Sequence, residues 1–99
     1  MLLADLGDDP VGFVSGIEIT HPDKGTEMLL YELGIDEPFR RRGFGTALVR
    51  GLLELADDLG CVAMWVPIDR HDTVAEATYR SAGAEEAEPA SLLTWDLTS

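Results

Sequence analysis

The stretch that decides the fold runs from Phe39 to Gly60 and reads FRRRGFGTALVRGLLELADDLG. Its second part carries apolar residues at three- and four-residue spacing, which predicts an amphipathic helix. The residues on this apolar face are Phe44, Leu48, Leu52, Leu55 and Leu59. Gly60 stands where a glycine commonly closes a helix, so the helix is expected to end there.

The first part of the same stretch places three arginines, Arg40, Arg41 and Arg42, next to one another. The chain as a whole is acidic, with 19 Asp and Glu against 7 Lys and Arg and a formal net charge of −12. A helix N-terminus exposes unpaired N–H groups and carries a partial positive charge of about +0.5. Gly43 and Gly45 lack a Cβ, so an anion can come close to the backbone. These features predict a phosphate site, although a solvated Arg-rich turn is the alternative reading of the same residues.

Upstream, two short apolar runs at 1–6 and 11–20 are separated by GDDP, which predicts a β-hairpin. Within the second run, alternate residues are expected to share one face of the sheet; they are Phe13, Ser15, Ile17 and Ile19. Glu27–Ile35 is mostly apolar on both faces and is therefore expected to be a central strand.

Downstream, Cys61–Val66 reads as a short buried strand, parallel to Glu27–Ile35 across a right-handed helical crossover. A second helix is expected over 72–83, with Asp72 as its N-cap and Gly83 as its stop. Residues 91–97 read as a last strand. The sequence therefore predicts one domain, 1–99, of the α+β class, with a mixed, largely antiparallel sheet, a βαβ unit and the order β-β-β-α-β-α-β.

The composition excludes several classes of protein. No run of 18 apolar residues is present and the start has no basic region, so neither a membrane span nor a signal peptide is expected. The acid excess argues against nucleic-acid binding; it fits a salt-adapted source as well as a general solubility role. The lone Cys61 favours a cytoplasmic location, and no His, Cys and carboxylate spacing indicates a metal site.

The motif RRRGFG has the spacing Arg-x-x-Gly-x-Gly, and it resembles the acyl-CoA-binding motif of the GNAT (GCN5-related) N-acetyltransferases. Downstream, DTVAEATYRSAGA is similar to the family's Asn-x-x-Ala-x-x-Leu-Tyr-x-x-x-Gly-Phe, with Tyr79 and Gly83 matching and Asp72 at the Asn position. Thr78 and Ala84 replace the family's Leu and Phe. Among subgroups, the sequence looks most like the aminoglycoside 3-N-acetyltransferase type I group.

The resemblance begins at what would be the family's second strand. The family's first strand and two helices, which wall the acceptor side, have no counterpart in these 99 residues. Three explanations stay open: another chain supplies the wall, the site is unusually open, or the sequence is a fragment.

The resemblance implies acetyl-CoA as acyl donor, with no metal. Its pyrophosphate would sit on the backbone from Arg41 to Thr46, which includes Gly43, Phe44 and Gly45, and Arg40 and Arg42 would reach its phosphates. The pantetheine arm would lie along the backbone of Leu33 and Ile35. Asp72 would either bond the pantetheine or only cap its helix.

The resemblance also implies the chemistry. Tyr79 would return a proton to the CoA thiolate, and Glu32 is the first candidate for the base that deprotonates the attacking amine. Glu27 and Asp36 are weaker candidates. The alternative readings are an aromatic packed on the sheet for Tyr79 and a solvated strand acid for Glu32.

The expected function is therefore an acetyl-CoA-dependent N-acetyltransferase that moves acetyl to a primary amine by direct attack in a ternary complex. The expected acceptor is a small cationic amine or a lysine side chain, because the chain is acidic. The alternative is a non-catalytic acyl-CoA-binding or partner-docking module of the same fold. A homodimer is expected, because a domain of this size has a limited core.

Overall fold

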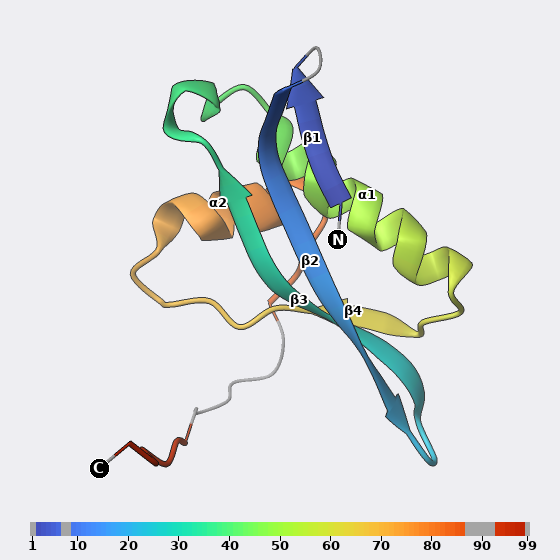
Figure 1. The fold of residues 1–99 in the computed structure, drawn as a ribbon. Helices are drawn as coiled ribbons and strands as arrows, with labels where there is room; N and C mark the ends of the chain where they lie inside the picture. Colours follow the sequence, from blue (N-terminus) through green and yellow to red (C-terminus); the bar gives the residue numbers. More distant parts are fainter. Residues whose placement is uncertain (1, 7–8, 87–92, 99) are drawn as a thin grey trace.

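The first part of the fold is a three-stranded antiparallel meander (Figure 1). The computed structural model describes residues 2–6, 9–86 and 93–98. Strand β1 is Leu2–Leu6, β2 is Asp9–His21 and β3 is Gly25–Ile35. The hairpin and the central third strand expected from the sequence are thus confirmed.

A βαβ unit follows from β3. After a 3-10 turn, η1 (Glu37–Phe39), the chain forms α1 (Phe44–Asp58) and then β4 (Ala63–Trp65), which pairs with β3 in parallel. The sheet order is β1-β2-β3-β4, and α2 (Thr73–Ser81) comes after it. The crossover helix and the parallel pair agree with the sequence, and the fold class is α+β with a mixed sheet.

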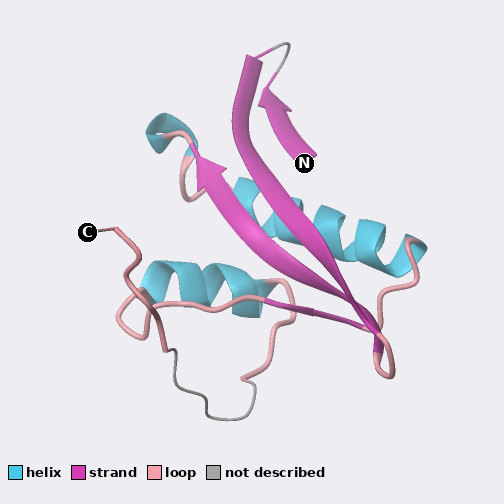
Figure 2. Ribbon diagram, turned by 60° about the horizontal axis from the view of Figure 1, so that its bottom comes forward, coloured by secondary structure: helices cyan, strands magenta, loops and turns pink. Residues whose placement is uncertain are grey.

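The helices lie on one side of the sheet, as the two views in Figures 1 and 2 show. The apolar stripe of α1 packs against this side of β2 and β3 and forms a single cluster of buried side chains. Its members are Val14, Met28, Leu30, Leu48, Val49, Leu52 and Ala56. The apolar period seen in the sequence is therefore the packing face of α1.

The pairing of β2 with β3 contains a bulge. Ser15 lies opposite Glu32, but the next residue, Gly16, lies opposite Leu30, so Tyr31 is an extra residue in β3. A bulge of this kind reverses the alternation of side chains along the strand. The apolar residues on both sides of the bulge can therefore reach the same core, while Tyr31 and Glu32 are both exposed.

Two expected strands differ from the structure. β4 spans only Ala63–Trp65 instead of 61–66, because the chain diverges from β3 once the three paired residues end and Pro67 follows. Of the last expected strand, 91–92 lie outside the described residues, and 93–97 form no strand. Among the described residues β4 pairs only with β3, and because 93–97 pair with no strand they lack the ladder hydrogen bonds that define one.

Candidate functional site

The corner between β3 and α1 contains two residues in left-handed backbone conformation. Gly43, the N-cap of α1, has φ 83°, and Arg41 has φ 63°. A side-chain-bearing residue in this region costs roughly 1–2 kcal/mol, and such strain gathers at functional sites. Left-handed residues also occur in the concave backbone turns that bind anions. The backbone at this corner therefore holds a left-handed turn that is costly for Arg41 and suited to an anion.

The first turn of α1 leaves its amides available. No side chain caps this helix, no acidic residue occupies its first turn, and the first intrahelical bond runs from the Ala47 N–H to the Gly43 carbonyl. Within the described residues, the N–H groups of Phe44, Gly45 and Thr46 have no protein acceptor. A helix start of this kind is suited to an anion.

The three arginines have different roles in the structure. The Arg40 Nε donates to the Ile35 carbonyl at 3.1 Å, which ties the corner to the end of β3. The Arg42 guanidinium lies 5.7 Å from the ring centres of both Phe39 and Phe44, close enough for cation–π attraction. Arg41 is exposed and makes no such contact among the described residues. Two of the arginines thus also shape the corner.

Two phenylalanines of this corner have a packing role that was not predicted from the sequence. Phe39 and Phe44 meet edge to face with ring centres 6.5 Å apart, and together they hold Arg42. In the sequence, this role is indicated only by a phenylalanine on each side of the arginine run.

The two glycines of the corner differ in their surroundings. The lack of a side chain at Gly45 serves packing as well as anion approach, because a Cβ there would lie 3.2 Å from the Thr78 Cγ2 of α2. Around Gly43, in contrast, the space is open.

The sheet opens next to this corner. β4 pairs with β3 only at Glu27–Leu29, and β3 continues through Leu30–Ile35 with no described strand on that side. An unpaired strand edge presents backbone donors and acceptors to a ligand. Leu33 and Ile35 lie on this stretch, so the expected pantetheine contacts fall on an open edge that leads towards α1.

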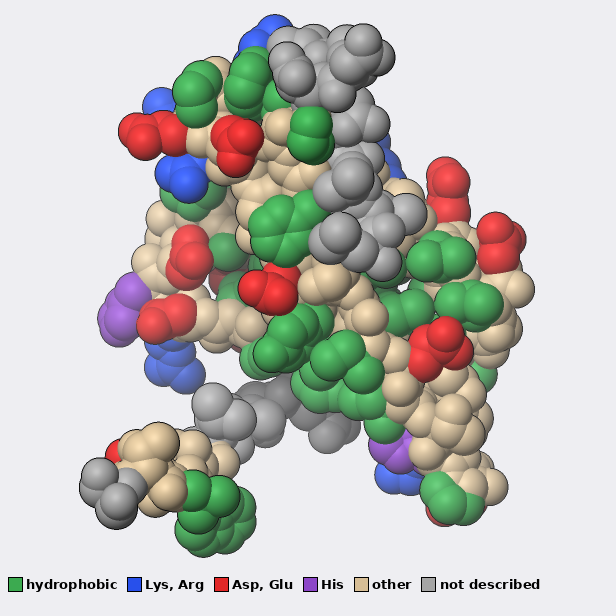
Figure 3. Space-filling view, in the orientation of Figure 1, with side chains coloured by type: hydrophobic (Ala, Val, Ile, Leu, Met, Phe, Trp, Pro, Cys, Tyr) green, Lys and Arg blue, Asp and Glu red, His purple; other side chains and the backbone are tan. Residues whose placement is uncertain are grey.

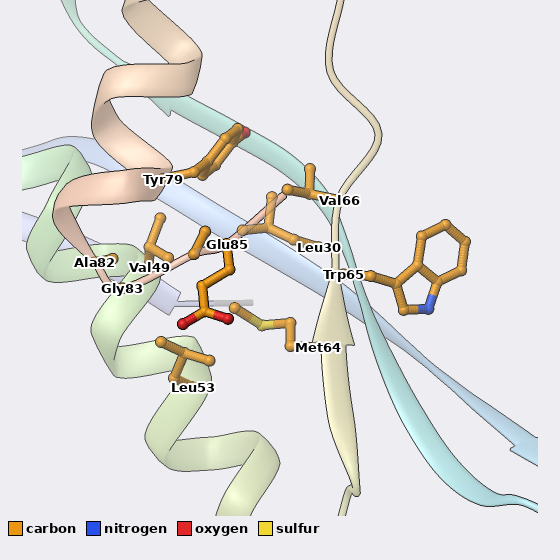
Figure 4. A pocket seen from close by; sticks show the side chains of 11 residues that line it. Leu30, Val49, Leu53, Met64, Trp65, Val66, Tyr79, Ala82, Gly83 and Glu85 are labelled. Carbon is orange, nitrogen blue, oxygen red and sulfur yellow. The ribbon is translucent and has the colours of Figure 1, made fainter. Parts of the chain in front are cut away.

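Tyr79 projects from α2 into this opening. Its half-buried side chain packs against the core cluster and lines two neighbouring cavities of about 280 and 140 Å³. In Figure 4 the Tyr79 ring lies near Val66 and Leu30, on the helix side of the sheet. Burial raises the pKa of Tyr79 above its usual 10.0, and the nearby Asp72 carboxylate raises it further. The phenol is therefore protonated at neutral pH and able to donate.

Asp72 acts as the helix cap that the sequence predicted. Its carboxylate accepts a hydrogen bond from the Ala75 N–H at 3.0 Å, which satisfies one amide in the first turn of α2. Its other expected role, a bond to pantetheine, stays a prediction.

Glu32 lies apart from Tyr79. It is exposed on the outer face of the sheet and lines neither cavity. Across the strand pair from it, the Ser15 hydroxyl oxygen is buried and has no hydrogen-bond partner among the described residues. No sequence pattern indicated Ser15, because its position opposite Glu32 depends on the bulge.

Two negative findings apply to the described residues. They contain no group of three His, Cys, Asp or Glu side chains placed to hold a metal ion. In 2–6, 9–86 and 93–98 there is also no helix that is long and apolar enough to cross a membrane.

Residues 1–84 match the acetyltransferase (GNAT) family, and the chain is a member of it. It is 33% identical over 61 residues to the [ribosomal protein bS18]-alanine N-acetyltransferase of Salmonella typhimurium, a match that covers 62% of this chain and 41% of that protein.

Solved structures share the fold. An aminoglycoside acetyltransferase from an uncultured soil metagenomic sample superposes with a TM-score of 0.87 at 22% identity, over 97% of this chain and 64% of that one. The aminoglycoside N-acetyltransferase AAC(6')-Iy, in complex with CoA, superposes with a TM-score of 0.80 at 18% identity, over 95% of this chain and 73% of that one. The chain thus spans about two fifths of the length of the curated relative and about two thirds of these structures.

Proposed function

We propose that this chain is an acetyl-CoA-dependent N-acetyltransferase that transfers acetyl directly to a primary amine in a ternary complex. One observation carries the proposal: the open edge of β3 leads into a helix start with free amides and two left-handed residues. An extended thioester arm fits such an edge as an added strand does. The pyrophosphate attached to that arm then meets the start of α1.

The donor site is assigned to residues on both sides of this corner. The pyrophosphate binds the amides from Arg41 to Thr46, with Arg41 as the side chain free to reach it. The pantetheine binds the backbone of Leu33 and Ile35. The CoA bound in a structural neighbour supports this choice of donor, as does membership of the family.

The reaction is acyl transfer from sulfur to nitrogen. The amine loses a proton to Glu32, directly or through water, and its nitrogen attacks the thioester carbonyl. A backbone N–H of β3 stabilises the oxyanion as it forms. The C–S bond then breaks, Tyr79 gives its proton to the leaving thiolate and regains one from solvent, and the nitrogen loses its second proton to solvent as the amide forms. Glu32 returns its proton to solvent.

The proposed acceptor is a small cationic amine or a lysine side chain. The formal net charge of −12 favours a cation near the site. Two neighbours are aminoglycoside acetyltransferases, which supports a small cationic amine, and one relative acetylates an alanine of a ribosomal protein, so a protein amine is also an acceptor among similar proteins. A cytoplasmic location and a homodimer stay predictions.

The alternative is a module that binds acyl-CoA without turnover, and the position of Glu32 away from the cavities favours it. Release of free thiol from acetyl-CoA over a panel of polyamines, aminoglycosides and lysine peptides separates the two. Thiol release that depends on an amine supports the transferase. Calorimetric binding of acetyl-CoA without thiol release supports the module, and the absence of both rejects the donor site itself.

A further inference from the structure

The Ser15 side chain points to the outer face of the sheet, because its neighbour in β2, Val14, belongs to the core cluster on the helix side. The Ser15 hydroxyl oxygen is buried and has no hydrogen-bond partner among the described residues. A buried hydroxyl without a partner is rare in folded proteins, since it loses its bonds to water and gains none in return. This hydroxyl is therefore a donor available to a group placed opposite it.

The bulge in β3 sets Tyr31 and Glu32 against Ser15, and Glu32 is its direct partner in register. Directly opposite residues of antiparallel strands have Cβ atoms about 4.5–5.5 Å apart. A serine hydroxyl and a glutamate carboxylate bridge that separation when the two side chains turn towards each other. The Tyr31 side chain is 61% exposed, and its rigid ring carries the phenol oxygen away from the strand. Glu32 is therefore the better acceptor for Ser15.

Glu32 also lacks a partner among the described residues, where its side chain makes no hydrogen bond and no ion pair. The residues that flank Ser15 on the same face of β2, Phe13 and Ile17, are apolar and offer neither side chain a bond. A base works only when its carboxylate lies within hydrogen-bond reach of the proton that it takes. An exposed glutamate has many rotamers, so a bond that selects one of them aids catalysis.

We infer that Ser15 is a positioning residue for the proposed base: its O–H donates to the Glu32 carboxylate and holds it beside the open edge of β3. The second carboxylate oxygen stays available to the amine and takes its proton, while the Ser15 hydroxyl keeps its own proton throughout. The inference rests on the proposed function, in which Glu32 is the base.

The first experiment is a double-mutant cycle on stability, which needs no turnover. Ser15→Ala, Glu32→Ala and the double variant are unfolded with urea. If the hydroxyl binds Glu32, Ser15→Ala lowers the folding equilibrium constant about two- to tenfold, and it has no further effect once Glu32 is alanine. If Ser15→Ala leaves stability unchanged or raises it, the hydroxyl is unpaired and the inference is overturned. A loss that persists in the Glu32→Ala background assigns the hydroxyl another partner and overturns it as well.

The second experiment measures amine-dependent thiol release from acetyl-CoA. Ser15→Ala is expected to lower kcat about tenfold, less than the roughly 100-fold expected for loss of a base, with KM for acetyl-CoA unchanged. Ser15→Thr keeps a hydroxyl and is expected to retain most of the activity. The matched control is Thr20→Ala, which removes a hydroxyl from the other end of β2, where it bonds the Thr26 hydroxyl at 3.0 Å.

The two proposals fail in different ways. An active wild type whose Ser15→Ala variant matches Thr20→Ala in kcat overturns the role of Ser15 and leaves the transferase in place. A wild type that releases no thiol with any amine of the panel rejects the proposed function, and the catalytic role of Ser15 with it.

Discussion

The two faces of the sheet differ in how they are covered. On the helix face, Leu52 of α1 and Val14 of β2 are 2% and 0% exposed. On the opposite face, Ile17 and Trp65 are 44% and 43% exposed, and Figure 3 shows apolar side chains gathered over the sheet there. The proposed donor site is built on the helix side by elements that are close in sequence. The candidate base, Glu32, lies on the opposite, less covered face of the sheet (the open face).

This difference separates two parts of the proposed function. Proposed binding of the donor depends on a corner formed by described residues of β3 and α1. In the proposed reaction, activation of the acceptor depends on a face that they leave uncovered, and roughly a third of the solved neighbour's chain lies outside its match to this one. Donor binding is therefore expected to be more robust than turnover.

The largest expected effect is a difference in unfolding free energy between a variant on the helix face and a variant on the open face. Leu52→Ala removes a buried side chain from the core and is expected to cost about 2–5 kcal/mol of unfolding free energy. Ile17→Ala, on the open face, is expected to cost less than about 1 kcal/mol. Urea denaturation of both variants measures the two values. Equal costs would mean that the outer face is covered in solution, as in an assembly through that face.

The next effect concerns Tyr79 and its protonation. Tyr79→Phe is expected to lower kcat about 100-fold, the lower end for a general acid, with Tyr31→Phe on the open face as the control. Because the folded pKa of Tyr79 is raised above 10.0, the phenol stays protonated up to at least that value. The alkaline fall in kcat and the alkaline loss of stability are therefore expected above pH 10. A fall in kcat between pH 7 and 9 would point to another acid.

A smaller effect tests the start of α1 against its end. Gly43 and Gly60 both have positive φ, 83° and 80°, and a Cβ at either would meet nothing within 4 Å. Gly43→Ala and Gly60→Ala are therefore expected to cost a similar roughly 1–2 kcal/mol of stability. Only Gly43→Ala is expected to weaken acetyl-CoA binding, by about tenfold in calorimetry or about 1.4 kcal/mol. A matching loss of affinity in Gly60→Ala would mean that strain alone explains the result.

The smallest effect separates two readings of Asp72. Asp72→Ala is expected to cost about 1 kcal/mol of stability, because it removes the bond to the Ala75 N–H. Asp72→Asn keeps an N-cap and should keep most of that stability. If Asp72 also binds pantetheine through its charge, Asp72→Asn lowers acetyl-CoA affinity while stability is retained. Unchanged affinity in that variant would leave capping as its only role.

Local patterns predicted most of the fold. The apolar period in 44–59 gave α1 nearly to the residue, since one face of that helix forms the core, and Asp72 marked the start of α2 as its cap. The strand predicted at 61–66 is shorter in the structure, and the strand predicted at 91–97 is not formed by 93–97. Both differences depend on pairing between segments that are distant in sequence, which a local pattern does not report.

The candidate site divides in the same way. The glycine and arginine pattern identified the helix start at the corner, because chain-neighbouring residues build it. The left-handed Arg41, the placement of Arg42 between Phe39 and Phe44, and Ser15 opposite Glu32 were not foreseen. They arise from tertiary packing and from a bulge, for which the sequence carries no periodic signal.

The most direct measurement of the central claim follows the backbone amides of Gly43, Phe44, Gly45 and Thr46 by two-dimensional NMR during titration with CoA. Pantetheine, which lacks the pyrophosphate, is the matched ligand. If the pyrophosphate sits on the start of α1, these amides shift most with CoA and stay in place with pantetheine. Amides that remain unmoved at saturating CoA, or that shift equally with both ligands, would contradict the proposed donor site.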